Sequence, residues 1–265
     1  MVVVRLFRLA AANRRLLLEL ARREIRGRFV GSRAGLLWSV LNPLVQLVSY
    51  GVIFGFVYRA ADGDSRTAFL SSLFCGLFPW WAFQESATRG LAALVDQAAL
   101  LKRTPLPPEI CVLSAVIGSF ALQSLGFLVF LAIFVGLGLV PLGPGFLLLP
   151  VALCAALLLA AGVALSLAPV HLVVRDTVHV VNAVFTILFF ASPVLYRLDA
   201  LPERLARIAA WNPVAGVIGL YRLAVLGMPF PSLAPLLSCL VAIAVVWWVG
   251  ATLFDRLGGH LDEYW

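Results

Sequence analysis

Residues 110–174 read ICVLSAVIGSFALQSLGFLVFLAIFVGLGLVPLGPGFLLLPVALCAALLLAAGVALSLAPVHLVV and contain no Asp, Glu, Lys or Arg. This run of 65 residues is far longer than the ~20 apolar residues that one membrane-spanning helix needs. The segment Pro141-Leu142-Gly143-Pro144-Gly145 inside it is typical of a turn. We therefore expect a hairpin of two spanning helices, at 111–140 and 146–173.

The composition of the whole chain agrees with a membrane protein. Hydrophobic residues make up 62% of the 265 residues and charged residues only 12%, whereas a soluble domain carries about 25% charged residues. The apolar stretches are long and uncharged, which favours helices over the short alternating strands of a membrane barrel. We expect an all-α integral membrane protein, with residues 1–265 forming one transmembrane domain.

The other apolar stretches predict four more spans, which gives six in total. They lie at 36–58, 67–87, 177–196 and 233–254. The first contains Asn42-Pro43, where a kink or a break is expected. Residues 197–232 hold apolar runs that are too short to cross, so we expect two short re-entrant or interfacial helices before the last span.

The segment before the first span is rich in arginine, with nine in the first 33 residues. Residues 9–29 predict an amphipathic helix that lies in the membrane interface. Its apolar stripe is expected to contain Leu18, Ala21, Ile25 and Phe29.

Basic residues are unevenly divided between the two sides of this six-span arrangement. Fourteen lie on the side of the N-terminus and six on the other. Because short cytoplasmic loops carry the excess of Lys and Arg, we expect both termini and the loop 88–109 to be cytoplasmic and 197–232 to face outward. This orientation signal explains the arginines, and nucleic-acid binding is disfavoured because no soluble domain is present to carry it.

The chain lacks the motifs of an energy-coupling or metal site. A phosphate-binding loop needs a glycine-rich stretch that ends in Lys-Ser or Lys-Thr, but the only lysine, Lys102, precedes Arg103. We therefore expect no enzymatic activity from this chain, and any ATP hydrolysis would come from a separate subunit. The four cysteines show no metal-ligand spacing, so no metal site is expected.

Ionisable residues are missing from the centres of the predicted spans, which disfavours an ion-coupled transporter. Glu85 and His171 lie near span ends, where an interfacial or packing role suffices. His171, Arg175 and His179 follow one another at four-residue steps and, with Asp176, form the best candidate for a catalytic group. Because the group lies in a predicted cytoplasmic turn, Arg175 and Asp176 are better explained by an orientation signal and a helix cap, and a catalytic role is disfavoured.

Aromatic residues are frequent in the predicted spans and in the segment 197–232. They fit either an interfacial belt or a path for sugars, since aromatic faces stack on sugar rings. The spacing of these residues does not choose between the two interpretations.

Several segments together resemble the membrane subunits of ABC exporters for polysaccharides, which include the O-antigen (Wzm-like) and teichoic-acid exporters. The matching segments, spread in order over most of the chain, are Arg23-Glu24-Ile25-Arg26-Gly27-Arg28-Phe29, Gly35-Leu36-Leu37-Trp38-Ser39-Val40-Leu41-Asn42-Pro43-Leu44, Leu100-Leu101-Lys102-Arg103-Thr104-Pro105-Leu106-Pro107-Pro108-Glu109-Ile110, Arg175-Asp176, Ser192-Pro193-Val194-Leu195-Tyr196 and Trp211-Asn212-Pro213.

Two departures from this family are visible. Leu106-Pro107-Pro108-Glu109 stands where the family commonly has Phe-Pro-Arg-Glu, so a basic residue of the partner contact is missing. Asn42 stands where the capsule branch usually has an acidic residue, which favours the O-antigen or teichoic-acid branch.

The resemblance implies a multi-pass permease of the cytoplasmic (inner) membrane that forms a homodimer and binds two ATPase subunits. The substrate would be a polysaccharide on undecaprenyl diphosphate, and ATP and Mg would bind the partner, with no cofactor in this chain. A permease for drugs or other lipids, or a membrane enzyme acting on a polyprenyl lipid, remains an alternative.

If the resemblance holds, four groups of residues are expected to carry the function. The candidates for binding the lipid head group are Arg22, Arg23, Arg26 and Arg28, and those for the glycan path are Trp38, Tyr50, Phe54, Tyr58, Phe189 and Tyr196. The candidates for the external gate are Trp211, Asn212, Pro213 and Tyr221. The candidates for ATPase coupling are Arg15, Asp96, Lys102, Arg103, Pro105, Pro107 and Glu109.

Overall fold

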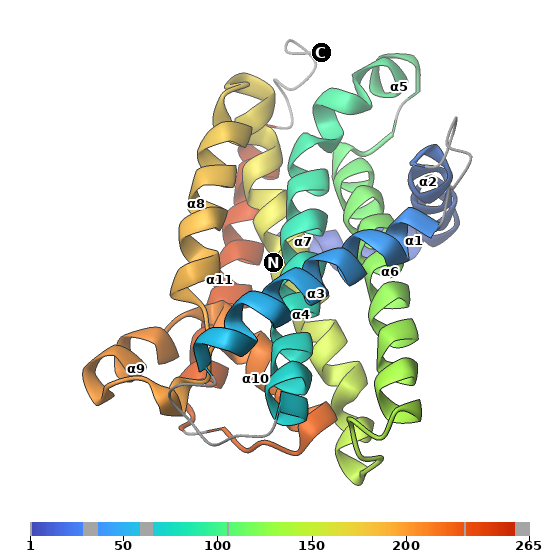
Figure 1. Ribbon diagram of the computed structural model, residues 1–265. Coiled ribbons are helices and arrows are strands. Elements are labelled where there is room, and N and C mark those ends of the chain that lie inside the picture. Colours follow the sequence, from blue (N-terminus) through green and yellow to red (C-terminus); the bar gives the residue numbers. More distant parts are fainter. Residues whose placement is uncertain (1, 29–36, 59–65, 105, 231, 258–265) are drawn as a thin grey trace.

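The computed structural model describes residues 2–28, 37–58, 66–104, 106–230 and 232–257 (Figure 1). All regular structure in these residues is helical, which confirms the predicted class. The α-helices are α1 (Val2–Ala12), α2 (Arg14–Gly27), α3 (Leu37–Tyr58), α4 (Arg66–Asp96), α5 (Ala98–Arg103), α6 (Pro108–Gly136), α7 (Leu149–Val173), α8 (Thr177–Ala191), α9 (Glu203–Ala210), α10 (Pro213–Leu226) and α11 (Ala234–Leu257). Two short 3-10 helices are η1 (Pro144–Leu148) and η2 (Leu198–Ala200).

Three described segments are long and apolar enough to cross a membrane: Pro108–Gly136, Pro144–Val173 and Ala234–Arg256. The first two are the hairpin expected from the uncharged run, with the turn between α6 and η1. A fourth span results if α9 and α10, which meet at a bend of 95°, are counted as one. The expectation of six crossings goes beyond this count and stays a prediction.

The predicted span 36–58 corresponds to α3, in which the stretch Leu41–Ile53 is described and apolar. The predicted span 177–196 corresponds to α8, which is only 15 residues long. At 1.5 Å per residue, α8 extends ~22 Å against a hydrocarbon core of ~30 Å. It ends at Ala191 rather than at residue 196 because Pro193 disfavours helical backbone at Ser192, which is extended.

The prediction of one N-terminal helix at 9–29 was wrong in its bounds. Two helices, α1 and α2, are present and are separated at Asn13. The stripe was also wrong at Leu18, which is exposed, whereas Leu17 and Ala21 are buried. The reason is the close approach of α2 to α6, where a Cβ at Gly118 would lie 2.8 Å from the Ala21 carbonyl oxygen. Phe29 lies outside the described residues.

The predicted polar segment 88–109 is mostly helical. α4 continues to Asp96 because Leu91, Ala93 and Leu94 are buried against its neighbours. α5 follows, and an extended Thr104 leads toward α6. The two short helices expected within 197–232 are confirmed as α9 and α10.

α4 is the centre of the bundle and packs against both α6 and α7. Glycines allow this close packing: a Cβ at Gly90 would lie 2.4 Å from Val116 of α6 and 2.5 Å from Ala164 of α7. Figure 1 shows α3 running obliquely in front of α4 and α6, and α5 at the opposite end of the bundle from α9 and α10. The oblique course of α3 leaves one face of α4 open to the site described next.

Candidate functional site

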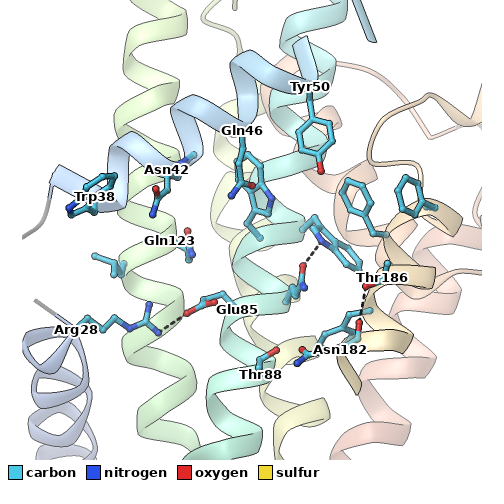
Figure 2. A pocket seen from close by; sticks show the side chains of 18 residues that line it. Arg28, Trp38, Asn42, Gln46, Tyr50, Glu85, Thr88, Gln123, Asn182 and Thr186 are labelled. Atoms are coloured by element: carbon cyan, nitrogen blue, oxygen red, sulfur yellow. Dashed lines mark hydrogen bonds and ion pairs between the residues drawn. The ribbon is translucent and has the colours of Figure 1, made fainter. Parts of the chain in front are cut away.

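A groove of about 680 Å³ lies between α3, α4, α6 and α8, and Arg28 at the C-cap of α2 closes one side (Figure 2). Its lining combines aromatic rings, side-chain amides and hydroxyls. The lining residues are Arg28, Trp38, Asn42, Pro43, Gln46, Tyr50, Trp80, Trp81, Gln84, Glu85, Thr88, Leu122, Gln123, Asn182, Phe185, Thr186, Phe189 and Phe190.

Helical periodicity explains how each helix contributes to this lining. Asn42, Gln46 and Tyr50 of α3 follow at four-residue steps, and so do Asn182 and Thr186 of α8. Residues four apart lie on one face of a helix. Each helix therefore presents a polar stripe to the groove although its overall composition is apolar.

Aromatic rings form a continuous cluster along α3, α4 and α8. The ring of Trp80 lies 5.5 Å from Phe189 and 6.3 Å from Phe185, and Tyr50 lies 6.0 Å from Phe189 (centroid distances). The contacts are tilted or edge-on, the arrangements that aromatic quadrupoles favour. Trp80 also donates a hydrogen bond from its indole nitrogen to the Gln84 side-chain oxygen at 2.7 Å.

Arg28 carries the main charge interaction of the groove. Its Nη2 lies 3.3 Å from Glu85 Oε1 and donates a hydrogen bond to the Ser119 hydroxyl at 2.9 Å, and its Nε lies 3.8 Å from Glu24. Burial lowers the pKa of Arg28 from its ordinary value, while the neighbouring Glu85 raises it. The guanidinium stays charged at neutral pH and is held by two carboxylates.

Of the four arginines predicted for a lipid head group, only Arg28 lines the groove. Arg22, Arg23 and Arg26 lie on the exposed face of α2. This face is the one that α2 turns away from α6.

Only some of the predicted glycan-path residues line the groove. Trp38, Tyr50 and Phe189 line the groove. Tyr196 lies beyond α8, where its hydroxyl donates to the Phe190 carbonyl oxygen at 3.3 Å. The backbones of Phe54 and Tyr58 belong to α3, but their side chains lie outside the described residues.

Three of the predicted external-gate residues, Trp211, Asn212 and Pro213, lie where α9 meets α10, whereas Tyr221 lies further along α10. Asn212 caps α10, with its side-chain oxygen accepting from the Val214 amide at 2.9 Å and its Nδ2 donating to the Ser192 hydroxyl at 2.8 Å. Pro213 is the first residue of α10, where its missing N–H costs nothing. Trp211 is 66% exposed, whereas Tyr221 is 1% exposed and packs edge-on against Phe127.

The predicted coupling residues differ in their accessibility. Arg15, Asp96, Lys102 and Arg103 are exposed and Pro107 is half-buried. Pro105 lies outside the described residues. Glu109 is buried and lies 3.8 Å from Arg5 of α1, which also pairs with Asp255 at the end of α11.

The alternative catalytic group is spread over a helix end. His171 is buried in α7, whereas Arg175, Asp176 and His179 are exposed. Among the residues that the structure describes, no group of three or more His, Cys, Asp or Glu side chains is placed to hold a metal ion.

Sequence reasoning missed the polar half of the groove. Gln46, Gln84, Gln123 and Asn182 were not identified as site residues, and Glu85 was assigned to an ordinary interfacial position. A usable signal was present, since an amide inside an apolar helix needs a polar partner or a polar cavity.

Comparison with known proteins places these observations in a family. The family described as ABC-2 type transporter matches residues 15–226. The chain is 29% identical over 255 residues to the O-antigen export system permease protein RfbA of Myxococcus xanthus, with 96% of each chain covered. It is 30% identical over 210 residues to an RfbA of Klebsiella pneumoniae, with 77% of each chain covered. It is 27% identical over 212 residues to the polysialic acid transport protein KpsM of Escherichia coli, with 77% of this chain and 78% of that protein covered.

Proposed function

The chain belongs to the ABC-2 type transporter family, and on this premise we propose that it is the membrane subunit of an ATP-driven exporter of lipid-linked polysaccharide. The relatives named as O-antigen export permeases favour O-antigen or a similar glycan as the substrate. The lipid carrier we propose is undecaprenyl diphosphate. The membrane is the cytoplasmic membrane.

The observation that carries this proposal is the chemistry of the groove. Aromatic faces such as Trp38 and Trp81 stack on the apolar faces of sugar rings, and amides such as Gln46 offer both a donor and an acceptor to a hydroxyl. A glycan presents these two kinds of surface on every residue. A groove between helices that offers both is suited to hold a chain of sugars and to let it slide.

The proposed topology has six crossings, made by α3, α4, α6, α7, α8 and α11, with both termini cytoplasmic. In this arrangement α5 lies at the cytoplasmic end and α9 and α10 at the external end, in keeping with their opposite positions in Figure 1. The whole of residues 1–265 forms the permease domain. A second copy of the chain completes the path, as a homodimer.

Arg28 is the proposed contact for the diphosphate of the lipid carrier. It combines a guanidinium, which suits phosphate oxygens, with a position on the lining of the groove. Arg22, Arg23 and Arg26 would attract anionic head groups to the exposed face of α2 without reaching the groove.

The proposed coupling surface for two ATPase subunits is formed by Arg15 of α2 and by Asp96, Lys102 and Arg103 around α5. ATP and Mg bind those subunits, and this chain needs no cofactor of its own. Glu109 is buried and would act indirectly, because its ion pair with Arg5 holds the start of α6 against α1. Closure of the ATPase dimer then pushes α5 and the N-terminal helices.

The proposed external gate is the α9–α10 bend. Asn212 ties it to Ser192 after α8, and Trp211 is exposed at its corner. Movement of α8 during transport therefore pulls directly on the gate.

The test is to purify the chain together with the ATPase encoded beside it and to measure ATP hydrolysis with and without lipid-linked polysaccharide. The proposal expects a stable complex whose hydrolysis rate rises with the substrate. The proposal is contradicted if the chain binds no ATPase, or if the rate of ATP hydrolysis by the complex does not change with any lipid-linked glycan tested.

A further inference from the structure

Charge is almost absent from the lining of the groove. Among its described lining residues only Arg28 and Glu85 are charged, and they pair with each other at 3.3 Å. Figure 2 shows this pair at the side of the groove next to α2, away from Tyr50 and Thr186. The described lining thus carries no net charge and no cation without a carboxylate partner.

Amides supply most of the polarity instead. Asn42, Gln46, Gln84, Gln123 and Asn182 come from four different helices and line one groove. Within the described residues, hydrogen bonds to the protein engage the Gln84 side chain but not the side-chain amides of the other four. These neutral groups are available to hydroxyls, to which they can both donate and accept.

A carboxylate on a sugar would weaken binding at such a site. It would lose water on entering a groove walled by Trp80, Phe185 and Phe189, and no unpaired cation would replace that water. An ionised group that is desolvated without a partner is strongly disfavoured. A hydroxyl in the same place exchanges water for an amide at little cost.

We infer that the groove selects uncharged stretches of glycan and disfavours glycans that carry a carboxylate on every repeat. This inference rests on the proposed function and narrows its substrate class. The amides then serve the neutral polymer. The diphosphate end, which carries more negative charge than one carboxylate, competes with Glu85 for Arg28.

The test uses two soluble probes with the same sugar backbone, pentagalacturonate and its fully methyl-esterified form, in which each charged carboxylate is replaced by a neutral ester. Each is titrated into the purified chain with its ATPase partner in lipid nanodiscs. Binding is followed by intrinsic tryptophan fluorescence, since Trp38, Trp80 and Trp81 line the groove. We expect the methyl ester to bind at least about tenfold more tightly than the free acid.

Two variants at one position separate charge from shape. Gln46 is exposed on α3 and faces the groove, so Gln46→Lys adds one cation to the lining. We expect this variant to tighten binding of the acid and to bring it close to that of the ester. Gln46→Met has similar length and no charge, and it should weaken both probes equally. Should Gln46→Lys fail to fold, Asn182→Lys places the same charge on α8.

The results that would overturn this inference differ from those that would overturn the proposed function. Equal binding of the two probes, or tighter binding of the acid, overturns the inference while leaving the exporter proposal intact. Binding of neither probe overturns the assignment of the groove to glycan altogether, whatever the ATPase measurement gives.

Discussion

Arg28 at the C-cap of α2 and Glu85 of α4 form an ion pair, with 3.3 Å between Nη2 and Oε1. Arg28 also reaches Ser119 of α6, so one side chain joins α2 to two helices that wall the groove. A displacement of α2 therefore acts directly on the groove. This contact is one physical link between the proposed ATPase-facing surface on α2 and the proposed glycan site.

Arg28→Ala should weaken the response of the complex to its lipid-linked substrate. We expect the concentration that half-maximally stimulates ATP hydrolysis to rise at least about tenfold, because a charge-assisted contact to the diphosphate is lost. Arg22→Ala, on the exposed face of the same helix, is the control and should change this concentration less than about twofold. Equal effects of the two variants would contradict a specific role for Arg28.

Gly76→Ala should destabilise the fold near the proposed external end. A Cβ at Gly76 would lie 2.1 Å from the carbonyl oxygen of Val194, and backbone on that side cannot yield without moving residues 192–196. We expect a loss of about 1–3 kcal/mol, the usual cost of overpacking, seen as a lower midpoint of thermal unfolding.

The control for this change is Gly136→Ala at the end of α6, where an added Cβ meets no atom within 4 Å. Its unfolding midpoint should stay the same or rise slightly, since alanine favours helix. A Gly76→Ala protein as stable as the Gly136→Ala protein would show that the 192–196 segment yields easily.

Charge reversal on α5, Lys102→Glu with Arg103→Glu, should prevent co-purification of the ATPase. Both side chains are exposed at the end of a short helix that contacts few other elements, so the folded permease should persist. Arg204→Glu with Arg207→Glu makes the same change on exposed α9 at the opposite end and should leave the complex intact. Retention of the ATPase by the α5 variant would move the coupling surface elsewhere.

Asn212→Ala should loosen the bend between α9 and α10. It removes the cap on Val214 and the bond to Ser192, and loss of an N-cap costs about 0.5–2 kcal/mol. We expect a lower unfolding midpoint and fewer glycans moved per ATP hydrolysed. Asn13→Ala is the matched control: Asn13 precedes α2 without capping it, and the change removes a side-chain hydrogen bond of 2.9 Å to the Leu9 carbonyl oxygen, so the coupling should stay unchanged. Unchanged stability and coupling in Asn212→Ala would remove this residue from the gate.

The sequence predicted those parts of the fold that depend on one helix at a time. The uncharged run 110–174 predicted the α6–α7 hairpin, and the short apolar runs after Arg197 predicted α9 and α10. Both follow from length, charge and turn residues alone. The buried face at Leu17 depends on the contact of α2 with α6, and α1 packs mainly against α11. Periodicity along the N-terminal segment contains neither contact.

The site was predictable only in part for the same reason. Trp38, Tyr50 and Phe189 stood out as aromatic residues within predicted spans, and all three line the groove. Gln123 and Asn182 lie almost 60 residues apart in the sequence, and only the packing of α8 against α4 and of α4 against α6 brings them to one cavity. A search for amides within apolar helices would have found them, although it would not have shown that they converge.

Transport itself tests the central claim most directly. The permease and its ATPase are reconstituted into proteoliposomes that contain undecaprenyl-diphosphate-linked polysaccharide, and the glycan that crosses the bilayer is measured with a lectin that cannot enter. The account predicts ATP-dependent transfer to the side opposite the ATPase, which the Arg28→Ala variant reduces strongly. A complex that hydrolyses ATP but leaves the polysaccharide on its original side would contradict it.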